Sequence, residues 1–130
     1  MVSIVDILPE LDERGLNVKI VCATSPELFA LQPEEYRLRV LSPADRADST
    51  VVTTQARRLM HDWLFDGLAE EYALSADWDN RWRTGGTLSD VIDEAHLSPQ
   101  WVLEGIERFV RERDARLARI QARLDGARGE

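Results

Sequence analysis

The chain has 130 residues, 44% of them hydrophobic, which is enough for one domain with its own core and too few for two. Its formal net charge of −8 argues against nucleic-acid binding, because that binding depends on Lys and Arg neutralising phosphates. No apolar stretch is long enough to cross a membrane and no secretory signal opens the chain, so we expect a cytoplasmic protein without a membrane partner.

The first predicted element is a helix with one apolar face over residues 1–14, ended by Gly15 as its C-terminal cap. Residues 18–23 then form a nearly continuous run of apolar and β-branched side chains, which is typical of a parallel strand covered on both faces. Cys22 lies inside this run, and we therefore expect an inert, buried thiol.

The elements that follow alternate between helix and strand. In chain order they are a short helix opened by Ser25 and Pro26, a helix over 33–41, a polar loop over 42–49, a strand over 50–54, a helix over 57–68 and a short strand over 72–75. Strands that alternate with helices indicate parallel βαβ units. Over residues 1–110 the sequence therefore predicts an α/β domain, a three-layer α/β/α sandwich around a mostly parallel sheet.

The end of the chain is predicted to be helical. Thr87 and Asp90 form a capping box for one helix, and Ser98 with Pro99 opens the last and longest helix. We assign residues 111–130 to a C-terminal extension of this helix and its tail, which projects beyond a domain of this size because ~15 helical residues reach about 22 Å.

Six residues are candidates for a protein interface. Trp78 and Trp82 lie in a predicted polar loop, where exposed indoles mark binding surfaces, although tryptophans are also common in cores. The other four follow a spacing of three and four along the last helix: Val110, Leu117, Ile120 and Leu124. An apolar seam on a projecting helix predicts docking to a partner, with a frayed tail as the alternative.

A candidate anion site precedes the helix that Thr87 caps. Free N–H groups at such a terminus can hold an anion, and the residues expected to hold it are Arg83, Thr84, Gly85, Gly86 and Thr87. The alternative is a flexible turn before an ordinary cap, because the stretch carries neither the Walker lysine nor a dinucleotide fingerprint.

We predict no catalytic centre and no metal site in this chain. Asp77 and Asp79 are spaced like calcium ligands, but the next ligand position holds Arg81. His61 and His96 are the only histidines, and no serine or cysteine is clearly placed as a nucleophile beside either.

Two stretches carry a longer pattern. The first reads Gly-Leu-Asn-Val-Lys-Ile-Val from Gly15 and Ser-Pro-Glu-Leu-Phe from Ser25, followed by Gln32 and Tyr36-Arg37; the second runs from Gly86 through Leu97 into the helix from Ser98. Together they resemble the C-terminal domain of transketolases, an architecture that homodimeric pyruvate dehydrogenase E1 enzymes share. The resemblance covers most of residues 10–110.

The resemblance implies a place in a thiamine diphosphate enzyme that transfers two-carbon ketol or acyl units. In that family the two preceding domains hold the cofactor and its divalent metal, so the resemblance implies no catalytic residue and no cofactor bound by this chain. It implies instead a domain that supports dimerisation and scaffolding, in contact with the rest of such an enzyme or in a homo-oligomer.

This chain departs from the family pattern at its start. The family's domain begins with a further strand inside the sheet, before the first helix, and that strand is absent here. A sheet without an interior strand leaves buried backbone groups unpaired at roughly 1–3 kcal/mol each, so we expect a fragment, a mis-started reading frame or one piece of a split enzyme. The alternative function is an independent flavodoxin-like adaptor that binds a protein or a small anion.

Overall fold

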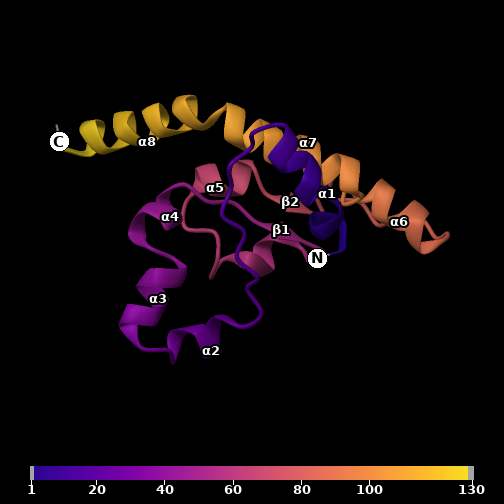
Figure 1. Ribbon diagram of the computed structural model, residues 1–130, viewed down its shortest axis with the longest axis horizontal. Coiled ribbons are helices and arrows are strands. Elements are labelled where there is room, and N and C mark those ends of the chain that lie inside the picture. Colours follow the sequence, from indigo (N-terminus) through magenta and orange to yellow (C-terminus); the bar gives the residue numbers. More distant parts are fainter. Residues whose placement is uncertain (1, 129–130) are drawn as a thin grey trace.

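The computed structural model describes residues 2–128, and it is built mainly of helices. Two of them, α1 (Val2–Glu13) and α7 (Pro99–Arg111), pack against each other. Figure 1 shows two short strands beside this pair, and α8 (Arg113–Arg128) extending away from the body toward the C-terminus.

The remaining elements are short. In chain order they are α2 (Pro26–Ala30), α3 (Glu34–Val40), α4 (Pro43–Ala47), β1 (Val52–Thr53), the 3-10 helix η1 (Arg57–Met60), α5 (Gly67–Glu71), β2 (Leu74–Ser75) and α6 (Leu88–Glu94). Within residues 2–128, no helix is long and apolar enough to span a membrane.

The predicted three-layer sandwich is wrong. Residues 2–128 are 58% helix and only 3% strand, and the sheet among them consists of β1 and β2 alone, parallel, with Val52 opposite Leu74. Residues 18–23, predicted to be a strand, form neither helix nor strand. A strand exists only where a neighbour pairs with its edge, and no backbone hydrogen bond joins residues 17–24 to the rest of the described chain.

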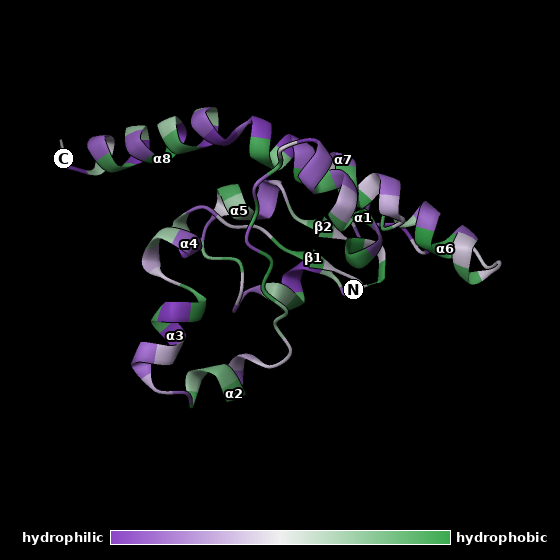
Figure 2. Cartoon of the chain, viewed as in Figure 1, coloured by the Kyte–Doolittle hydropathy of each residue, from purple (hydrophilic) through white to green (hydrophobic). Residues whose placement is uncertain are grey.

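Residues 17–24 consequently lie open to solvent. Cys22, which we expected to be buried, is exposed for this reason. Ile20 and Val21 are 40% and 36% exposed. In Figure 2 the hydrophobic colour of this thread, between α1 and α2, contrasts with the hydrophilic surface of α8.

Two further elements differ from the prediction. The loop expected over 42–49 contains α4, because Ser42 and Asp45 complete a capping box around it. The helix expected over 57–68 forms only η1 before the chain turns, and α5 begins separately where the side chain of Asp66 accepts from the N–H of Ala69.

Helix α1 ends as the sequence predicts. Gly15 has a φ of +65°, which glycine adopts without steric cost, and its N–H donates to the carbonyl of Asp12 (3.0 Å). The N–H of Leu16 donates to the carbonyl of Leu11 (2.9 Å), which completes a Schellman motif. This turn brings Leu16 into the core and releases the chain into residues 17–24.

The core lies where α1 and α7 meet beside β2. Its buried residues are Ile7, Leu11, Leu16, Val102 and Leu103. Gly105 lets α7 approach β2 closely, because a Cβ at this position would lie 2.5 Å from Leu74 Cδ1. The cluster between α1 and α7 therefore contains no residue from 25–41, although Leu41, Leu68, Ala69 and Tyr72 are buried elsewhere in the described chain.

Candidate functional site

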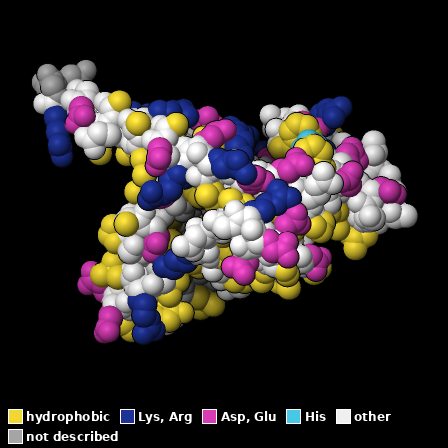
Figure 3. All heavy atoms as spheres, turned by 45° about the horizontal axis from the view of Figure 1, so that its top comes forward, with side chains coloured by type: hydrophobic (Ala, Val, Ile, Leu, Met, Phe, Trp, Pro, Cys, Tyr) yellow, Lys and Arg dark blue, Asp and Glu magenta, His cyan; other side chains and the backbone are white. Residues whose placement is uncertain are grey.

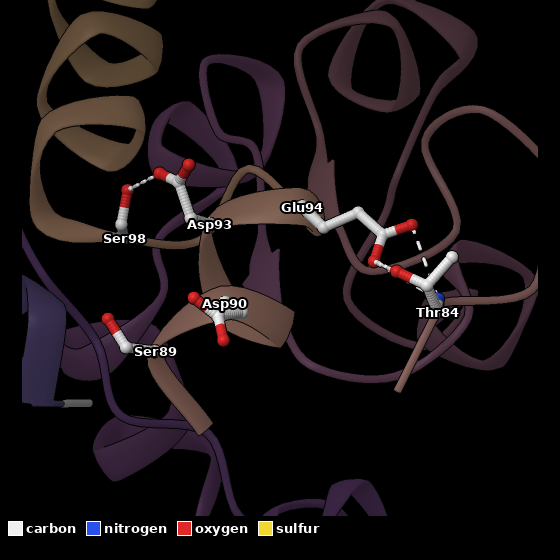
Figure 4. Close-up of a pocket in the computed structure, with 6 residues that line it drawn as sticks. All are labelled: Thr84, Ser89, Asp90, Asp93, Glu94 and Ser98. Carbon is white, nitrogen blue, oxygen red and sulfur yellow. Dashed lines mark hydrogen bonds between the residues drawn. The ribbon is translucent and has the colours of Figure 1, made fainter. Parts of the chain in front are cut away.

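Of the residues predicted to hold an anion, Thr84 borders an open depression of about 470 Å³ beside α6. Figure 4 shows the side chains that line it, from the loop before α6, from α6 itself and from the start of α7: Thr84, Ser89, Asp90, Asp93, Glu94 and Ser98. Three of these six residues are acidic, so the depression is suited to repel an anion.

Two N–H groups of the predicted anion site already have carboxylate partners. The N–H of Thr84 donates to the Glu94 carboxylate (3.1 Å), and the N–H of Thr87 donates to Oδ2 of Asp90 (3.0 Å). Gly85 and Gly86 link these two residues and are exposed. A diphosphate group, as thiamine diphosphate carries, would have to displace both carboxylates, and the residues present therefore do not fit it.

Arg83 points to a different acid. It forms an ion pair with Asp79 and donates to the backbone carbonyl of Glu94 (2.9 Å), while Arg81 Nε lies 3.0 Å from the same Asp79 carboxylate. Burial alone would raise the pKa of Asp79, but the hydrogen bonds from Arg83 and Arg81 outweigh it and hold this pKa at about 2. The cluster fixes the loop after β2 against α6.

An aromatic stack, which the sequence did not reveal, joins the same loop to α7. The ring of His96 lies between Trp78 and Trp101, with centroid distances of 4.0 and 3.8 Å and interplanar angles of 17° and 10°. His96 has a φ of +56°, an unusual value for a residue with a side chain. Trp78 is 23 positions from Trp101, so no local spacing indicates this contact.

The predicted interface residues fall into two separate groups. Trp82 is 97% exposed in the loop that the Asp79 cluster and the His96 stack attach to α6, whereas Leu124 is 50% exposed on α8. Figure 1 places α6 and the free end of α8 at opposite ends of the molecule. Val110 packs on the core, and Leu117 and Ile120 are half-buried, so the helix seam is only partly available.

An arginine clamp, also missed by the sequence analysis, holds the start of α8. Arg116 is 1% exposed; it donates to Asp48 (2.5 Å) and to the Phe109 carbonyl (2.7 Å), and its guanidinium lies 3.8 Å from the Phe109 ring centre. Arg113 bonds to the same Asp48. Burial would raise the pKa of Asp48, but the two arginines lower it overall.

Neither histidine is arranged for catalysis. The exposed His61 places Nε2 3.4 Å from Asp62 and has no nucleophile beside it, and His96 is held between two indole rings. In residues 2–128 no group of three or more His, Cys, Asp or Glu side chains is arranged to hold a metal ion.

Residues 17–24 form the remaining candidate, and the side chains of residues 18–20 within them alternate between two environments. Val18 and Ile20 line a groove of about 310 Å³ against α1, together with Leu8, Leu11 and Leu16. Between them, Lys19 turns the other way and reaches Asp45 of α4 (2.8 Å). This alternation has the period of a strand, although no strand pairs with it in the described chain.

Comparison with known proteins assigns no family. No protein-family model, no curated protein and no solved structure matches the chain. The transketolase resemblance therefore remains a prediction from the sequence patterns alone.

Proposed function

We propose that this chain is a non-catalytic domain or subunit of a transketolase-like, thiamine diphosphate-dependent enzyme in the cytoplasm, and that it works by associating with the rest of that enzyme. The sequence patterns from Gly15 and from Gly86 support the choice of enzyme. The observation that carries the proposal is the open state of residues 17–24, an apolar run with no backbone partner among the described residues.

An exposed apolar segment of this kind puts a protein that acts alone at risk of aggregation. Exposed, unpaired strand-like segments promote unwanted association, and monomeric proteins normally cover or charge them. Here Lys19 is the one charged side chain between Asn17 and Thr24, and Asp45 already neutralises it. A permanent partner that covers the segment accounts for its composition.

The division of chemistry follows from the site geometry. The N–H groups of Thr84 and Thr87 are bonded to carboxylates, so a diphosphate belongs elsewhere in the assembly. We place thiamine diphosphate and its divalent metal on other domains of the parent enzyme, which would supply the ketol-transfer chemistry. This chain would contribute contacts between subunits.

A chimaera tests this proposal. The full chain is fused behind the two cofactor-binding domains of a transketolase whose own C-terminal domain has been removed, and the molar mass is measured by light scattering together with ketol-transfer activity. We expect the chimaera to form the dimer, while the two cofactor-binding domains alone do not. A chimaera with the mass and activity of those two domains alone would contradict the proposal.

A further inference from the structure

Residues 17–24 offer backbone groups as well as apolar side chains. Within residues 2–128, none of their N–H or carbonyl groups takes part in a backbone hydrogen bond, and residues 19–24 are all exposed. Apolar side chains alone would accept a helix or a loop equally well. A continuous row of free N–H and carbonyl groups is matched by another extended backbone.

The side chains are already placed for strand pairing. Val18 and Ile20 face the groove against α1, and Lys19 is bonded to Asp45 on the other side. These contacts hold Val18, Lys19 and Ile20 in alternate directions, while the backbone groups of residues 17–24 have no backbone partner within residues 2–128. The incoming strand has to offset the ordering of residues 21–24.

Charge at both ends of the segment indicates what the incoming strand carries. Asp12 and Glu13 precede it and Glu27 follows it, and all three are exposed and form no ion pair within residues 2–128. A hydrogen bond from its own backbone N–H and a second from the Ser25 hydroxyl lower the pKa of Glu27, so this side chain is a carboxylate at neutral pH. Lysine or arginine at each end of a strand would complement these acids.

The same charges disfavour a second copy of this chain. Antiparallel pairing of two copies would bring the Asp12–Glu13 end of one against the Glu27 end of the other. Each copy also carries a net charge of −8, so the two bodies repel.

We propose that residues 17–24 accept an extended β-strand from a different polypeptide, an apolar strand with basic residues at both ends. The strand pairs through backbone hydrogen bonds, while the acids at the two ends of the segment select its charge. This inference deepens the proposed function and rests on it for the identity of the partner, but the recognition chemistry can be tested without that partner.

The test uses the full chain and labelled decapeptides in fluorescence anisotropy. The probe peptide has six alternating Thr and Val residues between two Lys at each end; a second carries Glu at both ends, and a third has Pro for one central Val. We expect saturable binding of the Lys-ended peptide and at least roughly tenfold weaker binding of the other two at low salt.

Two variants of the chain sharpen the test. Val21→Pro removes one backbone donor from the segment, and we expect binding to weaken by roughly tenfold or more with an unchanged melting temperature, because that donor has no partner in the free chain. Val21→Thr keeps the donor and the β-branch, and it should bind within about threefold of the parent chain.

Four results would overturn the inference. They are an absence of saturable binding, equal binding of the Lys-ended and Glu-ended peptides, a clear loss of thermal stability in Val21→Pro, and self-association of the chain that Val21→Pro abolishes. The last would make a second copy the occupant. If the peptides do not bind but the chimaera is a dimer, strand addition at residues 17–24 is rejected and the proposed function still holds.

Discussion

The α1–α7 pair and residues 17–41 are both rich in apolar side chains, yet only the first region buries them. Ile7 and Val102 are 3% and 1% exposed where α1 meets α7, whereas Leu28 of α2 and Leu31, which follows that helix, are 62% and 79% exposed. The space-filling view shows hydrophobic side chains reaching the surface between charged ones (Figure 3). Helices α1 and α7, of 12 and 13 residues, cover each other's apolar faces, whereas the five-residue α2 has no buried residue.

The largest expected effect is on stability, and it differs between the α1–α7 pair and residues 17–41. Leu103→Ala empties a site that is 4% exposed, so we expect the free energy of unfolding to fall by about 2–5 kcal/mol. Leu28→Ala is the matched control, and it should change that free energy by no more than about 0.5 kcal/mol because its side chain is mostly in water. Urea denaturation of both variants measures the difference, and equal losses would show that α2 is packed after all.

The next effect concerns how α8 is attached. Asp48→Asn leaves the buried Arg116 without its charged partner and should cost about 1–3 kcal/mol in urea denaturation. Glu71→Gln removes only the exposed pair with Arg119 and serves as the control, with little change in melting temperature. If the two variants behave alike, the Arg116 clamp does not hold α8.

A smaller effect is expected at the aromatic stack. His96→Ala loses contacts with both Trp78 and Trp101 and also places a Cβ at positive φ, so we expect a loss of about 1–2 kcal/mol. His96→Gly loses the same contacts without the backbone strain and should be the more stable of the two. Tryptophan fluorescence during thermal unfolding ranks them, and the reverse order would exclude strain at this position.

The smallest effect is a dependence on pH. Asp79 has a pKa of about 2 in the folded chain, below the ordinary value near 4, so its contribution to stability is present above about pH 4 and is lost as pH falls toward 2. The parent chain should therefore take up about one proton more on unfolding near pH 3 than Asp79→Asn does. The slope of the free energy of unfolding against pH measures this proton uptake. Equal slopes in the variant and the parent chain would show that Arg83 and Arg81 do not bind Asp79.

The contrast between the regions also explains which elements the sequence could predict. Most signals carried by near neighbours succeeded: the Gly15 turn, the Ser25 cap and the capping box of Thr87 with Asp90 are all present. The exceptions are Ser98, whose side chain makes no cap hydrogen bond, and the capping box of Ser42 with Asp45, which lay in a predicted loop. Each of these depends on residues no more than five positions apart, so the sequence order itself brings the groups together.

Elements that depend on distant partners were not predictable in this way. The run over 18–23 has the composition of a buried strand, but composition does not supply the neighbouring strand that pairing requires. The contact between Asp48 and Arg116 spans 68 positions, and the stack around His96 joins three separate segments. The predicted anion site fails at two of its ligands, because Glu94 and Asp90 already accept from the N–H groups of Thr84 and Thr87.

Amide hydrogen exchange of the free chain tests most directly whether residues 17–24 lack a backbone partner. We predict that their amides exchange within about tenfold of the rate of an unstructured peptide, while the amides of Val102 and Leu103 in α7 exchange at least roughly a hundredfold more slowly. Protection of residues 17–24 comparable to that of α7 would contradict the account, because the segment would then already be paired within the chain.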